Sequence, residues 1–137
     1  MIKKIAIIGC SLRLPSLDTS TSNFWKNLTE EKNLITEVNP NRWSQDSFNH
    51  PNKKHLGTSY TFAAGSIGDI TKFDAEFFGI SPREAALMDP QQRLLLEMSW
   101  EAIENAGIKP SAISESSCGV FIGMATTDYA SRLADDL

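Results

Sequence analysis

The stretch that decides the fold runs from Phe73 to Gly107 and reads FDAEFFGISPREAALMDPQQRLLLEMSWEAIENAG. It contains two helix starts, Ser81-Pro82 and Asp89-Pro90, in which a side chain able to accept from a free backbone N–H precedes a proline. Proline is tolerated at the first helical position because its missing N–H would have no partner within the helix. A Glu or a Gln follows each capping residue three positions later and can reach back to it. We therefore predict one helix from Pro82 and another from Pro90.

The second of these helices is predicted to run from Pro90 to about Asn105, with Gly107 as its C-terminal stop. Beyond the first turn its polar residues form one narrow stripe, and almost all of the remaining positions are apolar. A helix that is apolar around most of its circumference is buried, so we expect a large structure to cover it. The stripe consists of Arg93, Glu97, Glu101 and Glu104.

Composition excludes several classes of protein. The chain has 137 residues, enough for one domain, and its 41% hydrophobic and 22% charged residues are typical of a globular protein. A net charge of −4 argues against nucleic acid binding through a broad basic surface. No apolar run is long enough to span a membrane or to act as a secretion signal. Because the two cysteines also lack metal-type spacing, we predict a cytoplasmic protein in a reducing compartment.

Short apolar runs predict the strands. Ile5–Gly9 and Gly119–Gly123 are continuous apolar runs that suit strands buried on both faces, as in a parallel sheet covered by helices. Tyr60–Ala64 alternates between large and polar or small residues and predicts a weaker strand that ends at Gly65.

The remaining segments carry weaker signals. A helix is predicted within Thr19–Glu31, with Phe24 and Trp25 expected in the core. Lys32–Pro51 is expected to be irregular, and Lys109–Ile113 is expected to form a turn. Met124–Leu137 is expected to be weakly helical.

The predicted elements do not close on themselves. Strands alternate with helices, which favours an α/β fold, yet only two strands are convincing and both need cover on two faces. A two-stranded sheet is too small to bury a helix that is apolar almost all round. We infer that the chain is part of a larger α/β domain; the alternative is an obligate oligomer that completes the core.

No residue type in the chain suggests a reaction by itself. Cys10 follows a predicted strand but has no histidine in its loop, so we interpret it, like Cys118, as structural, and expect a small buried apolar role for it. His50 and His55 flank a polar loop and lack a third ligand, which favours a solvated loop over a metal site. Arg13 is interpreted as an arginine that fixes its loop, with an anion contact as the alternative.

Phosphate-binding signatures are absent as well. Gly65–Gly68 does not form a dinucleotide fingerprint, and there is no Walker A motif. The like charges of Glu97, Glu101 and Glu104 suggest a contact with an arginine elsewhere rather than a catalytic pair.

Longer motifs carry a resemblance to a known family. FDAEFFGISPREA from Phe73, MDPQQRLLLE from Met88 and WEAIENAG from Trp100 resemble the N-terminal part of a β-ketoacyl synthase of the modular polyketide synthase type. Ser16 and Ala64-Gly65-Ser66 depart from the glycines usual in that family, without putting its function in doubt. Five shorter matches extend the resemblance over nearly the whole chain: Ile5–Gly9, Arg13–Pro15, Phe24-Trp25, Arg42-Trp43 and Gly119–Gly123.

The resemblance implies a thiolase-like fold, in which two βαβαβαββ halves stack as α-β-α-β-α layers. Residues 1–137 would form most of the first half, ending before the catalytic cysteine. It implies an acyltransferase that performs decarboxylative Claisen condensation of an acyl thioester with malonyl-carrier protein, in polyketide or fatty acid synthesis. The partners implied are an acyl carrier protein, which delivers substrate on phosphopantetheine, and a second copy in a homodimer formed through the complete domain. No cofactor is expected to bind directly.

The same resemblance leaves this chain without catalytic residues. The family uses a cysteine in a Thr-Ala-Cys-Ser-Ser-type motif, activated at a helix N-terminus, together with two histidines. Ser116–Gly119 has the wrong order, and His50 and His55 match neither family histidine. We therefore expect no catalytic, cofactor-binding or metal-binding residue here, and an isolated chain that is inactive. The alternative is a non-catalytic half that acts as an interaction module, or as a partner resembling a chain-length factor.

Overall fold

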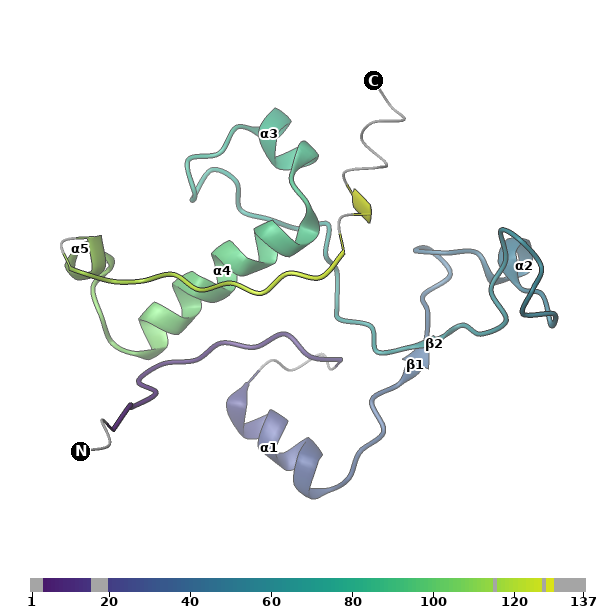
Figure 1. The fold of residues 1–137 in the computed structure, drawn as a ribbon, viewed down its shortest axis with the longest axis horizontal. Coiled ribbons are helices and arrows are strands. Elements are labelled where there is room, and N and C mark those ends of the chain that lie inside the picture. The colour runs from purple at the N-terminus through teal and green to yellow at the C-terminus, as the bar shows by residue number, and fades with distance from the viewer. Residues whose placement is uncertain (1–3, 16–19, 115, 127, 130–137) are drawn as a thin grey trace. The chain divides into compact units, whose positions relative to one another are not determined.

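The computed structural model describes residues 4–15, 20–114, 116–126 and 128–129 (Figure 1). The chain divides into two compact units, one comprising Met1–Leu12 with Asp69–Leu137 and the other Arg13–Gly68. Each unit is described by itself. Most of the tail predicted to be weakly helical lies outside the described residues.

The Arg13–Gly68 unit begins with the predicted helix. Helix α1 spans Thr21–Thr29, and the Ser20 side chain caps it by accepting from the Asn23 N–H at 3.2 Å. The expectation that its aromatic pair lies in a core is wrong, because Trp25 is 67% exposed and Phe24 is exposed as well. The helix forms from local signals, but its apolar face is left uncovered.

The small core of this unit surrounds Phe62. Strand β1, Thr36–Glu37, pairs antiparallel with β2, Ala63–Ala64, so that Thr36 lies opposite Ala64. Phe62, at 6% exposure, is the buried apolar residue among those that the structure describes, and Trp43 lies 4.8 Å from it, ring centroid to centroid. The predicted strand is therefore confirmed only at its last two residues.

Lys32–Pro51 is more ordered than its weak periodicity suggested. Besides β1 it contains helix α2, Gln45–Phe48, which is capped by the Ser44 hydroxyl. Phe48 packs against Trp43, with the two ring centroids 5.6 Å apart. The aromatic contact, which sequence periodicity does not reveal, fixes this short helix.

The second unit contains both helices predicted from the proline starts. Helix α3 spans Pro82–Leu87 and α4 spans Pro90–Asn105. The Ser81 hydroxyl accepts from the Glu84 N–H at 3.2 Å, and the Asp89 carboxylate accepts from the Gln91 N–H at 2.8 Å. The Gln91 amide also donates to Asp89, in place of the return contact predicted from the third helical position. Helix α5, Pro110–Ser114, stands where a turn was predicted.

Helix α4 ends as predicted, at a glycine. Ala106 is the last residue with helical angles, and Gly107 has φ +66°. The Gly107 N–H donates to the Glu104 carbonyl and the Ile108 N–H to the Ile103 carbonyl. This is the Schellman arrangement, which satisfies two carbonyls that would otherwise lack partners.

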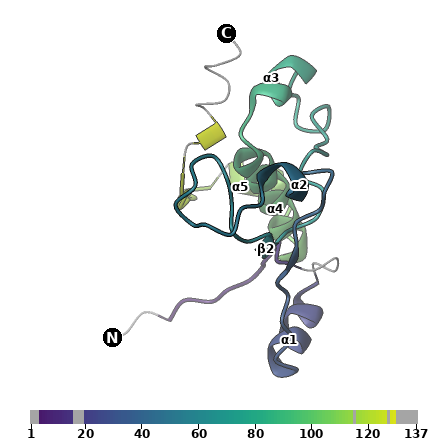
Figure 2. The ribbon, with the colours of Figure 1, turned by 90° about the vertical axis from the view of Figure 1, so that its right-hand side faces the viewer.

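The two main predicted strands are absent from this chain's structure. Ile5–Gly9 and Gly119–Gly123 have no regular secondary structure and appear as open traces (Figures 1 and 2). A strand exists only with a hydrogen-bonded neighbour, and within the described residues the sheet consists of β1 and β2.

Helix α4 is only partly covered, as expected for a helix that needs more cover than these residues supply. Its residues past the first turn are half-buried or exposed, and none is buried. An aromatic group does pack on it, because Phe77 meets Trp100 edge to face with ring centroids 4.7 Å apart. The cover that its sequence requires is only partly supplied.

Candidate functional site

Residues 9–11 pack directly against α4 in the second unit. A Cβ built on Gly9 would lie 2.3 Å from the Ala102 carbonyl oxygen. The backbone at Gly9 therefore lies so close to α4 that a residue with a side chain would clash there. The Cys10 N–H donates to Asn105 Oδ1 at 3.1 Å, and the Ser11 hydroxyl donates to Glu101. The exit from the predicted strand is thus held along one side of α4.

The acidic stripe of α4 has structural partners. Glu101 accepts from Ser11, and Glu104 Oε1 accepts from the Trp100 indole N–H at 2.8 Å. These contacts position an N-terminal segment and an aromatic ring. They do not form a pair of carboxylates that could act together on one substrate. Arg93 shares the stripe, and its Nε is a buried nitrogen without a hydrogen bond to any described residue.

Neither cysteine has the surroundings of a nucleophile. Cys10 and Cys118 are free thiols and both are exposed, so the expectation of a small buried role for Cys10 is wrong. The Cys118 thiol lies 3.8 Å from the carbonyl oxygen of Gly119, its neighbour in the chain. An activated cysteine needs a cation, an imidazole or a helix N-terminus, and among the described residues no such group forms a hydrogen bond with either thiol.

The histidine pair stacks, and its geometry does not suit a metal ion. The rings of His50 and His55 lie 4.1 Å apart, centroid to centroid, at 22°. The nitrogen lone pairs of two stacked rings lie in two nearly parallel planes. They therefore do not point at one common ion at the usual Zn–N distance of about 2.0–2.1 Å. His50 Nδ1 accepts from the Asn52 N–H, which leaves the proton of the neutral ring on Nε2. Among the described residues no three metal-ligating side chains cluster.

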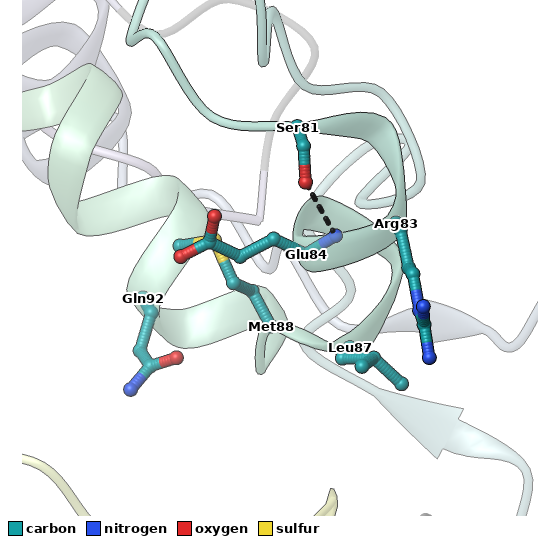
Figure 3. Close-up of a pocket in the computed structure, with 6 residues that line it drawn as sticks. All are labelled: Ser81, Arg83, Glu84, Leu87, Met88 and Gln92. Carbon is teal, nitrogen blue, oxygen red and sulfur yellow. Dashed lines mark hydrogen bonds between the residues drawn. The ribbon is translucent and has the colours of Figure 1, made fainter.

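A shallow hollow lies where α3 meets α4 (Figure 3). Its volume is about 350 Å³. Arg83 and Glu84 carry opposite charges there, and the Ser81 hydroxyl is already occupied by its cap bond to the Glu84 N–H. No residue of the lining is a nucleophile with a base beside it, and sequence reasoning did not single out this place. The lining consists of Ser81, Arg83, Glu84, Leu87, Met88 and Gln92.

Comparison with known proteins identifies the class. Residues 3–136 match the family described as "Beta-ketoacyl synthase, N-terminal domain", and the chain belongs to that family. It is 51% identical over 130 residues to the polyketide synthase GfsE of Streptomyces halstedii. It is also 46% identical over 132 residues to the pikromycin polyketide synthase component PikAII of Streptomyces venezuelae. The predicted family is confirmed.

Solved structures agree. The chain superimposes on the ketosynthase from module 6 of the bacillaene synthase of Bacillus subtilis 168 with a TM-score of 0.78, at 34% identity over 92% of its length. It also superimposes on the oxazolomycin ketosynthase domain OzmH KS7 of Streptomyces albus with a TM-score of 0.71, at 35% identity over 80% of its length. The fold is therefore α/β and thiolase-like, and present in part.

The matches cover most of this chain's length but little of its relatives. The chain spans 3% of GfsE, 4% of PikAII and 21% of the bacillaene ketosynthase. In the described part of the chain, no helix has the length and apolar character that crossing a membrane requires.

Proposed function

We propose that this chain is the N-terminal portion of a ketosynthase domain that ends before the catalytic cysteine, and that the complete domain is a condensing enzyme of polyketide synthesis. The observation that carries the proposal is the family match over residues 3–136, together with the superposition on one fifth of a ketosynthase. The relatives named above are polyketide synthases, which favours that pathway over fatty acid synthesis.

The reaction proposed for the complete domain is decarboxylative Claisen condensation. An acyl group is held as a thioester on the enzyme's cysteine. Loss of carbon dioxide from malonyl-carrier protein leaves a carbanion at C2, which attacks the acyl carbonyl. A carbon–carbon bond forms, the cysteine thioester breaks, and the thiolate regains a proton. The products are a β-ketoacyl thioester on the carrier and carbon dioxide.

This chain supports that chemistry without performing it. The family cysteine and both histidines have no counterpart among its residues, and its two thiols are free and exposed. The chain contributes structural elements of the domain. These are α4, with residues 9–11 fixed along it, and the apolar runs Ile5–Gly9 and Gly119–Gly123, which form strands in the complete domain. The isolated chain is therefore inactive.

The partners follow from the same chemistry. The domain receives substrate from an acyl carrier protein on phosphopantetheine, binds no cofactor directly, forms a homodimer when complete, and works in the cytoplasm. These properties rest on the family, since the chain covers a small share of its relatives.

A chimeric ketosynthase tests the proposal. The part of the bacillaene module 6 ketosynthase that matches this chain is replaced by residues 1–137, and formation of the β-ketoacyl thioester on the carrier protein is measured. We expect condensation by the chimera and none by the isolated chain. The control is the same chimera with the host's catalytic cysteine changed to alanine. A folded but inactive chimera, or turnover by the isolated chain, would contradict the proposal.

A further inference from the structure

The loop from Asn49 to Ser59, here called the histidine loop, is closed on itself and attached to the end of α2 (Figure 1). The His50 N–H donates to the Ser59 carbonyl at 2.9 Å, and the Ser59 N–H donates to the Phe48 carbonyl at 2.8 Å. Within the loop the rings of His50 and His55 stack, with their centroids 4.1 Å apart. The loop is thus a compact piece of structure whose two ends are joined by backbone hydrogen bonds.

The turn inside the loop depends on an acceptor that His50 provides. His50 Nδ1 accepts from the Asn52 N–H at 3.1 Å. Asn52 fixes the next residues, because its side-chain oxygen accepts from the Lys54 N–H and its carbonyl accepts from the His55 N–H, both at 3.0 Å. A neutral imidazole that accepts at Nδ1 carries its proton at Nε2, so a second proton binds at Nδ1. There it would face the Asn52 N–H, and two donors cannot share a hydrogen bond. Protonation of His50 therefore breaks this turn.

His55 is placed differently. The Thr58 hydroxyl donates to the His55 carbonyl at 2.9 Å, so its oxygen is left to accept from His55 Nδ1, which lies 3.4 Å away. The neutral His55 ring then has its free lone pair at Nε2, where a proton binds without breaking a hydrogen bond of the loop. Of the two stacked rings, only His50 has to give up a contact in order to become charged.

The charges near the pair disfavour a second positive ring. The groups that can carry charge in the histidine loop and in the segments joined to it are Lys53, Lys54 and Tyr60 and, in α2, Asp46. Lys53 Nζ lies 4.5 Å from the centre of the Tyr60 ring. The sequence has no Asp or Glu from residue 47 to residue 68, and among the described residues no carboxylate forms an ion pair with either histidine. Two protonated rings in this stack would therefore repel each other with nothing to neutralise them.

We propose that the histidine loop is a pH-sensitive switch, which is closed while His50 is neutral and opens when His50 binds a proton at Nδ1. Because the closed loop excludes that proton, closure is stable at higher pH and is lost as the pH falls. Opening releases the bond between the Ser59 N–H and the Phe48 carbonyl, and with it the restraint on the end of α2, whose Phe48 packs against Trp43. The inference goes beyond the proposed function and does not depend on condensation.

Hydrogen exchange in the folded chimeric ketosynthase tests the switch. Exchange in residues 49–59 is measured at about pH 7.5 and about pH 5.5, on either side of the range in which histidine changes charge, and is corrected for the intrinsic effect of pH. An ordinary histidine is about nine-tenths protonated at the lower pH, so we expect protection in the loop to fall by about tenfold. Peptides from α4 are the internal control and should keep their protection. Unchanged protection of the loop, or an equal loss in α4 that signals global unfolding, would overturn the inference.

Two variants assign the effect to His50. In His50→Asn the side-chain oxygen can still accept from the N–H two residues on, as in an Asx turn, but it binds no proton, so we expect protection to change by less than about twofold between the two pH values. His55→Phe is the matched control, because it keeps an aromatic ring in the stack and leaves His50 in place, and it should still lose protection by about threefold or more. A response of His50→Asn equal to that of the unchanged loop, or no response of His55→Phe, would contradict the proposal.

The same chimera keeps this inference separate from the proposed function. A folded chimera that does not condense would contradict the function and still report on the loop. An active chimera whose loop ignores pH would overturn the switch alone.

Discussion

Gly9 lies at a position where a side chain would clash with α4. A Cβ at this position would meet the Ala102 carbonyl oxygen at 2.3 Å and the Ala106 Cβ at 2.8 Å. Backbone atoms of a helix do not move aside as the end of a flexible side chain can. We therefore predict that Gly9→Ala lowers the free energy of unfolding of the chimeric domain by about 1–3 kcal/mol.

Chemical denaturation measures that effect, and Gly68→Ala is the control. Nothing lies within 4 Å of a Cβ at Gly68, so we expect a change within about 0.5 kcal/mol there. Equal stability of the two variants would show that residues 9–11 are not held against α4 in the completed domain.

A second prediction at this scale concerns Asp69. The Thr71 hydroxyl donates to the Asp69 carboxylate, the Thr71 N–H donates to it at 2.9 Å, and together these bonds lower the pKa of Asp69. A lowered pKa in the folded state means that the stabilisation is present above the ordinary aspartate range and is lost as the pH falls through the folded value. We expect Thr71→Val to raise the pKa of Asp69 toward its ordinary value.

Carbon-detected NMR titration of the Asp69 carboxyl measures this change. Lys72→Met is the matched control, because the Lys72 charge is the weakest of the causes that lower the pKa, and it should move the titration less than Thr71→Val does. A larger shift in the lysine variant would show that charge, and not hydrogen bonding, holds the carboxylate ionised.

At the scale of the element, Gly107 terminates helix α4. Gly107 has φ +66°, which costs an L-residue with a side chain roughly 1–2 kcal/mol. We predict that Gly107→Ala destabilises the chimeric domain by about that amount, and that the helix frays at its last turn. Gly107→Asn should cost less, since asparagine tolerates this conformation better.

Thermal unfolding and the amide exchange of Ile108 check the prediction, because the Ile108 N–H donates to the Ile103 carbonyl in the same motif. Gly68→Ala is again the control, because nothing lies within 4 Å of a Cβ at that position and its φ is not positive. If Gly107→Ala leaves Ile108 protected, the Schellman motif is not what ends the helix.

At the scale of the whole molecule, the chain buries too little apolar surface to stand alone. Phe62 is the buried apolar residue in the described part, while the runs Ile5–Ile8 and Val120–Ile122 and the apolar face of α1 are exposed. We predict that the isolated chain unfolds without a cooperative transition and binds an apolar dye, as incompletely packed states do.

Circular dichroism during heating, with dye fluorescence and size-exclusion chromatography, measures this, and the single-chain chimera is the control that should unfold cooperatively. A sharp transition of the isolated chain at a defined oligomeric state would show that it closes its own core. The interaction-module reading would then gain support.

The sequence by itself determined the local features. The starts of α3 and α4 and the end of α4 at Gly107 follow from contacts between residues two to five positions apart, which propensity and capping rules describe. The long motifs around α3 and α4 likewise determined the family, and the composition of Ile5–Gly9 and Gly119–Gly123 is typical of strands buried on both faces.

Only the tertiary structure decided which of these runs has a neighbour. Ile5–Gly9 and Gly119–Gly123 carry the composition of strands but are not strands here, because a strand depends on hydrogen bonds to residues far away in the sequence. The pairing of Thr36 with Ala64 and the approach of Gly9 to Ala102 are equally non-local. No periodicity in a single chain encodes such contacts, since they depend on how distant segments meet.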